Sequence, residues 1–156
     1  MNHPRWVRRV FNDRELEEIA EAVGRVEQRA AAEVRVHLER WVRRARGEQP
    51  DALRRAQTLF RELRMHEAPH RNGVLVYLAL DDRKLAIVGD EAIHARVGDT
   101  YWERVRDVMV GHFKAEAPRD AVVHAVEDLG RVLAEHFPRR PGDAGAGDLP
   151  NEVSIE

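Results

Sequence analysis

The stretch RNGVLVYLALDDRKLAIVG, residues 71–89, decides the fold. The turn at Asn72-Gly73 leads into VLVYLAL (74–80), a continuous apolar run that predicts a central strand buried on both faces. Only residues 81–84 separate this run from LAIVG. Because so short a link permits only an antiparallel connection, the stretch predicts a β-hairpin.

Upstream of the hairpin, the segment AEVRVHLER (32–40) alternates strictly between apolar and polar residues. This pattern predicts a strand covered on one face only, near a sheet edge. A helix opened by Pro50 connects this strand to the 74–80 run, so we expect the two strands to be parallel. Before the strand, Asn12 and Glu15 have the spacing of a capping box and predict the start of another helix.

Two more helices are predicted downstream of the hairpin. Thr100 and Glu103 form a second candidate capping box, and Pro118 suits the first turn of the last helix. Residues 139–156 are rich in glycine, proline and acids, which predicts a disordered tail. We therefore expect one α/β domain over residues 1–138, with a small mixed β-sheet sandwiched by helices in three layers, α/β/α.

Composition excludes several classes of function. The chain has no cysteine, so it has no disulfide, no thiolate catalyst and no cysteine-type zinc site. Its single serine, Ser154, lies in the tail, which argues against serine-hydrolase chemistry. No stretch approaches the roughly 20 apolar residues of a membrane-spanning helix, and the N-terminus lacks the apolar core of a secretory signal. We therefore expect a cytoplasmic protein.

These segments, in this order, resemble a TPM domain of the short type without signal peptide or membrane anchor. The residues that carry the resemblance are EVRVHLE (33–39), RNGVLVYLALDDRKLAIVGDEAI (71–93), VGDTYW (97–102), FK (113–114), HFP (136–138) and the ending LPNEVSIE (149–156). The resemblance implies a three-layer α/β fold and a family described as acid phosphatases, divalent-metal binders and accessory factors in membrane-protein maintenance. It also implies a membrane-anchored TPM protein or a LemA-type membrane protein as partner.

One departure from the family pattern bears on function. Many exported members carry a Gly-Tyr-Gly-Leu-Glu-Gly stretch after the hairpin, where this chain has GDEAIH at residues 89–94. Side chains at those positions restrict the approach of the backbone, so a phosphate-binding loop that relies on glycine is not transferred. Our first hypothesis is a non-catalytic accessory domain that binds a protein partner, and the alternative is a metal-dependent acid phosphatase.

Asp81 and Asp82 are the most interesting acids for that alternative. They follow the central strand at its carboxyl end, where ligands of open α/β sheets bind. With Glu39 nearby, the two carboxylates could hold Ca²⁺ or Mg²⁺, which prefer oxygen ligands. The competing interpretation is that aspartate is simply a favoured turn residue.

The pentapeptide RWVRR occurs twice, at residues 5–9 and 40–44. The candidate surface-binding residues of the second copy are Arg40, Trp41, Arg43, Arg44 and Arg46. Interleaved arginine and tryptophan suit an anionic membrane or RNA, provided that both copies lie on one exposed face. The alternative is that the tryptophans fill the edge of the core. Sixteen acids against ten basic residues over 81–156 argue against nucleic acid.

Overall fold

The computed structural model describes residues 3–141 and 153–156 of the chain. Its helices are α1 (Arg5–Arg8), α2 (Asp13–Arg29), α3 (Ala52–Glu62), the 3₁₀ helix η1 (Met65–Glu67), α4 (Glu91–Lys114) and α5 (Pro118–His136). Its strands are β1 (Val34–Glu39), β2 (Val74–Ala79), β3 (Lys84–Gly89) and β4 (Ser154–Ile155). The predicted capping box of α2 is present, since Asn12 and Glu15 each accept a hydrogen bond from the other's backbone N–H.

The sheet has the strand order β3-β2-β1-β4. Strands β2 and β3 pair antiparallel, as the short link predicted, and β1 pairs parallel to β2 from Val34↔Val74 to Glu39↔Ala79. Strand β4 pairs parallel to the outer side of β1 through two residues. The sheet is therefore mixed, as expected.

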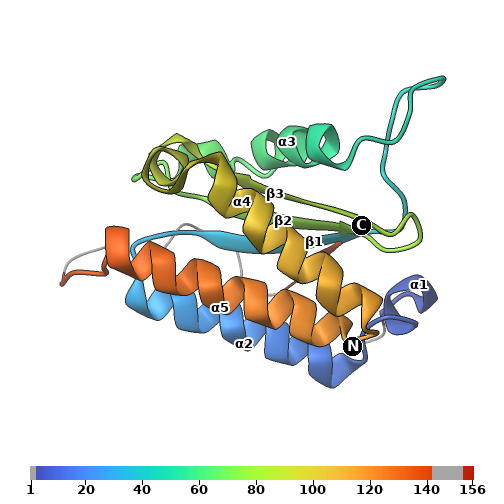
Figure 1. Cartoon of the computed structure of the whole chain (residues 1–156), viewed down its shortest axis with the longest axis horizontal. Helices are drawn as coiled ribbons and strands as arrows, with labels where there is room; N and C mark the ends of the chain where they lie inside the picture. The colour runs from blue at the N-terminus through green and yellow to red at the C-terminus, as the bar shows by residue number, and fades with distance from the viewer. Residues whose placement is uncertain (1–2, 142–152) are drawn as a thin grey trace.

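Helices cover both faces of this sheet (Figure 1). Helix α3 lies on one face, α2 and α5 lie on the other, and α4 packs against α5 and β3. Alternate β2 side chains enter two separate cores: Val74, Val76 and Leu78 join the core on the α2 and α5 side. Leu75 and Tyr77 join the core under α3. The three-layer α/β/α expectation is confirmed.

The polar face of β1 is buried, which corrects the prediction of a strand covered on one face only. All six residues of the strand are buried, and Arg35, His37 and Glu39 point to the α3 side of the sheet. Strict alternation of apolar and polar residues normally indicates a solvent face. Here Arg55 of α3 and Tyr77 of β2 hydrogen-bond Glu39, and Ser154 of β4 contacts His37.

Helix α4 begins nine residues before the predicted start at Thr100. Asp90 caps it by accepting a hydrogen bond from Glu91 N at 2.8 Å. The helix is interrupted at Gly98, which has φ +75° and ψ 174°. This break explains why the sequence placed the helix start at Thr100, because the residues after Gly98 resemble the start of a new helix.

The end of the chain also differs from expectation. Residues 139–156 were predicted to be disordered, yet Ser154–Ile155 form β4 on the edge of β1, and Glu156 N donates to Leu38 O at 3.1 Å. The open edge of β1 can accept a strand too short to show a periodic pattern. Residues 142–152 lie outside the described residues. No helix in the described part of the chain combines the length and apolarity needed to cross a bilayer.

Candidate interaction site

The carboxyl ends of β1 and β2 lie together at one end of the sheet because these strands are parallel. Their ladder continues beyond the strands: Leu80 N donates to Glu39 O at 2.9 Å, and Asp81 N donates to Arg40 O at 2.8 Å. The β2–β3 turn therefore lies beside the chain that leaves β1. Helix α1 lies at the same end of the molecule (Figure 1).

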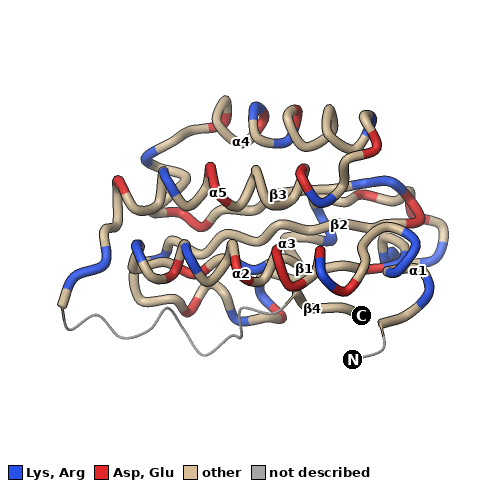
Figure 2. Tube along the Cα trace, turned by 90° about the horizontal axis from the view of Figure 1, so that it is seen from below, with Lys and Arg blue, Asp and Glu red and all other residues tan. Residues whose placement is uncertain are grey.

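The two RWVRR segments meet at this end and line two open cavities of about 740 and 720 Å³, which share Trp6 and Arg40. We call their eight polar and aromatic side chains the Arg–Trp surface: Arg5, Trp6, Arg8 and Arg9 from the N-terminal copy, and Arg40, Trp41, Arg43 and Arg44 from the copy after β1. Figure 2 shows basic residues gathered around α1 and the neighbouring loop. Arg46 is exposed but lines neither cavity.

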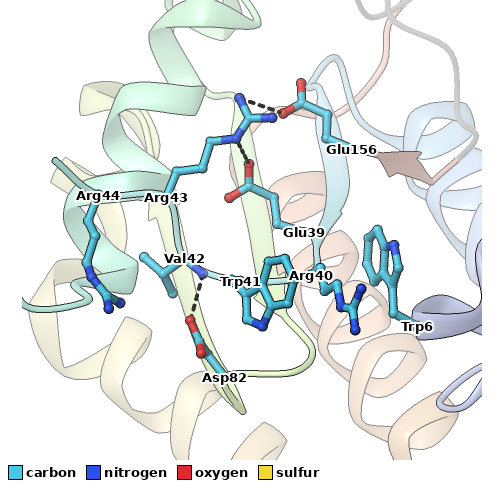
Figure 3. Close-up of a pocket in the computed structure, with 9 residues that line it drawn as sticks. All are labelled: Trp6, Glu39, Arg40, Trp41, Val42, Arg43, Arg44, Asp82 and Glu156. Atoms are coloured by element: carbon cyan, nitrogen blue, oxygen red, sulfur yellow. Dashed lines mark hydrogen bonds and ion pairs between the residues drawn. The ribbon is translucent and has the colours of Figure 1, made fainter. Parts of the chain in front are cut away.

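The two tryptophans of this surface differ in burial. Trp6 is partly buried and packs against the core, as the competing interpretation expected. Trp41 is 55% exposed, and the Arg40 guanidinium lies 4.3 Å from its ring centroid (Figure 3). Arg8 and Arg44 are exposed and form no ion pair with any other described residue. The surface therefore presents an exposed aromatic ring together with two positive charges, Arg8 and Arg44, that have no ion pair among the described residues, while Arg40 and Arg43 are paired with acids.

The predicted metal ligands Asp81 and Asp82 hold the loop that follows β1 in place. Asp81 Oδ2 accepts a 2.7 Å hydrogen bond from Arg40 Nε, and Arg9 Nη2 lies 3.8 Å from the same oxygen. Asp82 Oδ2 accepts a 2.8 Å hydrogen bond from Val42 N (Figure 3). The two carboxylates thus join both copies of RWVRR to the β2–β3 turn.

Glu39 is 2% exposed and lies in a separate buried network. Arg55 of α3 donates to it from Nη2 at 2.6 Å and from Nε at 3.0 Å, and Tyr77 Oη donates at 2.7 Å. Burial alone would raise the pKa of Glu39, but His37, Arg55 and Tyr77 outweigh it and hold that pKa well below its usual range. Burial and the bond to Glu39 raise the pKa of Tyr77. Glu39 is therefore ionised and fully engaged.

Sequence reasoning missed two residues beside Glu39, namely His37 and Glu156. Buried His37 bonds through Nδ1 to Ser154 Oγ, and its Nε2 lies 3.9 Å from a Glu39 oxygen and 3.8 Å from a Glu156 oxygen. Nothing in the local sequence pairs positions 37 and 156, since β4 alone brings them together. Glu156 also lies 3.8 Å from Arg43 Nη1 and 3.6 Å from Arg55 Nη2.

In the part of the chain that the structure describes, Asp81, Asp82 and Glu39 are not close enough to one another to share an ion. Asp81 and Asp82 do not converge with Glu39, and each carboxylate already accepts hydrogen bonds from protein donors. Among the described residues, the one trio of possible ligands close enough to share an ion is His37, Glu39 and Glu156. The Glu39 carboxylate of that trio already forms an ion pair with Arg55. Ca²⁺ takes six to eight oxygen ligands, more than the two carboxylates of the trio supply.

Comparison with known proteins supplies a family and a fold. Residues 7–132 match the family described as the TPM domain. The NMR structure of the BA42 protein from the psychrophilic bacterium Bizionia argentinensis is 31% identical, with a TM-score of 0.80 over 94% of this chain and 95% of that one. The N-terminal domain of a P. gingivalis protein, solved by NMR, shares the fold at 19% identity and a TM-score of 0.64, over 84% and 83% of the two chains. No curated protein matches the chain.

Proposed function

The chain belongs to the TPM domain family, and from this premise we propose that it is a non-catalytic accessory domain whose Arg–Trp surface binds an acidic protein partner. We place this role in the cytoplasm, where a membrane-anchored TPM protein or a LemA-type protein is the candidate partner. The observation that carries the proposal is the meeting of both RWVRR segments around two adjoining cavities. Clustered arginines beside an exposed tryptophan are typical of binding hot spots.

The carboxylates at this end support a binding role rather than catalysis. A general base or a metal ligand needs a carboxylate free to contact substrate or ion. Asp81 and Asp82 instead accept hydrogen bonds from Arg40 and Val42, and Glu39 is held by Arg55. Weak divalent-metal binding and phosphatase activity stay predictions from the family resemblance.

The exposure of Trp41 favours an anionic membrane as the second candidate partner. Tryptophan partitions into the membrane interface, and each nearby arginine adds about 1 kcal/mol of attraction to an anionic leaflet. Trp41 is 55% exposed and carries the Arg40 guanidinium on its ring. This candidate uses the same side chains, so experiment must separate it from the first.

A binding assay with two probes tests both candidates. We expect a fluorescent ten-residue polyglutamate peptide to bind the chain at low salt, with an affinity that falls steeply as salt screens the arginines. We expect little sedimentation with vesicles that contain one-third phosphatidylserine. Binding to those vesicles without binding to the peptide would favour the membrane candidate, and binding to neither would reject the Arg–Trp surface as an interaction site.

A further inference from the structure

The terminal residues 153–156 occupy the edge of β1 next to the Arg–Trp surface. Their backbone pairs with only two β1 residues, in the register His37↔Ser154 and Leu38↔Ile155. The side chains of Val153 and Ile155 pack partly buried against the core. This is strand addition to a sheet edge, a mode in which backbone hydrogen bonds supply affinity and side-chain pockets supply specificity.

The contacts of Glu156 in this position are loose. Its carboxylate oxygen lies 3.6 Å from Arg55 Nη2, 3.8 Å from Arg43 Nη1 and 3.8 Å from His37 Nε2, all longer than a hydrogen bond. Figure 3 shows Arg43 between Glu156 and Glu39. The side chain of Glu156 is 41% exposed and that of Arg43 is 67% exposed, so solvent reaches this ion pair.

An unsatisfied polar atom lies in the same place. His37 is 1% exposed, and its Nε2 has no hydrogen-bond partner within residues 3–141 and 153–156, although two carboxylates lie just beyond reach. A buried polar atom without a partner costs free energy that a better-placed acceptor would recover. Arg55 also has Glu62 3.8 Å from its Nη1, whereas Arg43 without Glu156 keeps only a 3.9 Å contact to Glu39, which Arg55 already engages.

We propose that the β1 edge, with His37, Arg43 and Arg55, is a receptor site for an extended acidic segment of a partner protein, and that residues 153–156 are its internal competitor. The inference rests on the proposed function, because Glu156 and Arg43 line the same cavity as Trp41 and Arg44. The partner segment resembles the internal one: a branched apolar residue placed as Ile155, followed by a carboxylate placed as Glu156. Displacement of β4 exposes the edge that the partner strand then pairs with.

The test uses a fluorescent hexapeptide, Asn-Glu-Val-Ser-Ile-Glu, which has the sequence of residues 151–156. A chain that ends at residue 152 should bind it saturably, and the complete chain should bind it at least about tenfold more weakly because its own strand competes intramolecularly. Equal binding to both chains, or no binding to the shortened chain, would overturn the proposal. If the shortened chain does not fold by circular dichroism, the complete chain with Ile155→Asp and Glu156→Gln takes its place.

Matched variants separate this site from general attraction to arginine. In the shortened chain, Arg43→Ala should weaken peptide binding at least about fivefold, whereas Arg44→Ala, next in the chain but without contact to Glu156, should change it less than about twofold. A peptide with glutamine in its last position should also bind at least about fivefold more weakly. Equal losses from Arg43→Ala and Arg44→Ala would contradict strand addition.

Failure of this inference is distinguishable from failure of the proposed function. Polyglutamate binding depends on Arg8 and Arg44, whereas hexapeptide binding depends on Arg43 and His37, so either result can fail while the other stands.

Sedimentation of the 156-residue chain should show a monomer at all concentrations. A dimer that disappears on shortening the chain would assign the β1 edge to a second copy and overturn the proposal.

Discussion

The carboxylate of Glu39 and the guanidinium of Arg55 form a buried ion pair that joins β1 to α3, with Nη2 2.6 Å from Oε2. Both side chains are less than a tenth exposed. Each therefore depends on the other, because a buried charge without a partner is strongly unfavourable. The pair also anchors the strand end from which the Arg–Trp surface begins.

Removal of the Arg55 side chain should destabilise the fold severely. We expect Arg55→Ala to lower the free energy of unfolding by about 3–5 kcal/mol, since Glu39 stays buried without its main partner. The neighbouring Arg54 is exposed on the same helix, and Arg54→Ala should change stability by less than about 0.5 kcal/mol. Urea denaturation measures both values, and similar losses from the two variants would show that the ion pair contributes little.

Glu27 should make stability fall as pH rises. Burial, together with Glu33, raises the pKa of this carboxyl from 4.5 to about 7 in the folded state. Between those pH values Glu27 loses its proton in the unfolded chain and keeps it in the folded chain. The stability that Glu27 contributes is therefore fully present below pH 4.5 and is lost as pH rises through about 7.

We therefore expect Glu27→Gln to raise the free energy of unfolding at pH 8 by about 1–2 kcal/mol, a value discounted for partial solvent screening. At pH 4.5 the same variant should match the parent chain. Glu21→Gln, an exposed change on the same helix, should have no effect at either pH. A gain that is the same at both pH values would rule out titration of Glu27 as the cause.

The terminal strand should contribute modestly to stability. The disordered tail predicted from the sequence implies that removal of residues 139–156 leaves the melting temperature unchanged. Because Val153 and Ile155 are partly buried against the core, we now expect a chain that ends at residue 152 to lose about 1–2 kcal/mol. Thermal melting of the 156-residue chain and of the chain that ends at residue 152 measures this loss, and identical curves would show that β4 does not form in solution.

Metal and phosphatase chemistry should be weak or absent at the predicted acids. We expect Ca²⁺ or Mg²⁺ at millimolar concentration to shift NMR signals around residues 79–84 only slightly, since Arg40 already engages Asp81. Hydrolysis of p-nitrophenyl phosphate should stay at background with either ion. Turnover that Asp81→Asn abolishes, and that Asp107→Asn at an exposed position of α4 leaves intact, would overturn the non-catalytic account.

Patterns within single segments predicted much of the fold. The Asn12 capping box, the hairpin at residues 74–89 and the parallel pairing of β1 with β2 all follow from local spacing and short connections. The pattern of alternation misled at the polar face of β1, because no local signal tells a solvated Glu39 from one paired with Arg55. Strand β4 has two residues and pairs with a strand more than 110 residues earlier, so no periodicity announces it.

The candidate site was predictable in its parts but not in its arrangement. The repeated RWVRR suggested a surface, and the structure brings the two copies together around Trp6 and Arg40. Asp81 and Asp82 stood out as turn acids at a strand end, yet their partners, Arg40 and Val42, come from a loop 40 or more residues away. Long-range pairing of this kind depends on the register of the sheet rather than on any motif.

Charge reversal at Arg8 and Arg44 tests the central claim most directly. Neither side chain has an ion pair within the described residues, so Arg8→Glu with Arg44→Glu should leave folding unchanged. A matched control reverses two exposed arginines elsewhere that likewise have no ion pair among the described residues, Arg25→Glu on α2 with Arg61→Glu on α3. We predict that the first pair weakens polyglutamate binding at least about tenfold and that the control pair weakens it less than about threefold. Equal losses in the two double variants would show that binding follows net charge alone and would contradict a specific role for the Arg–Trp surface.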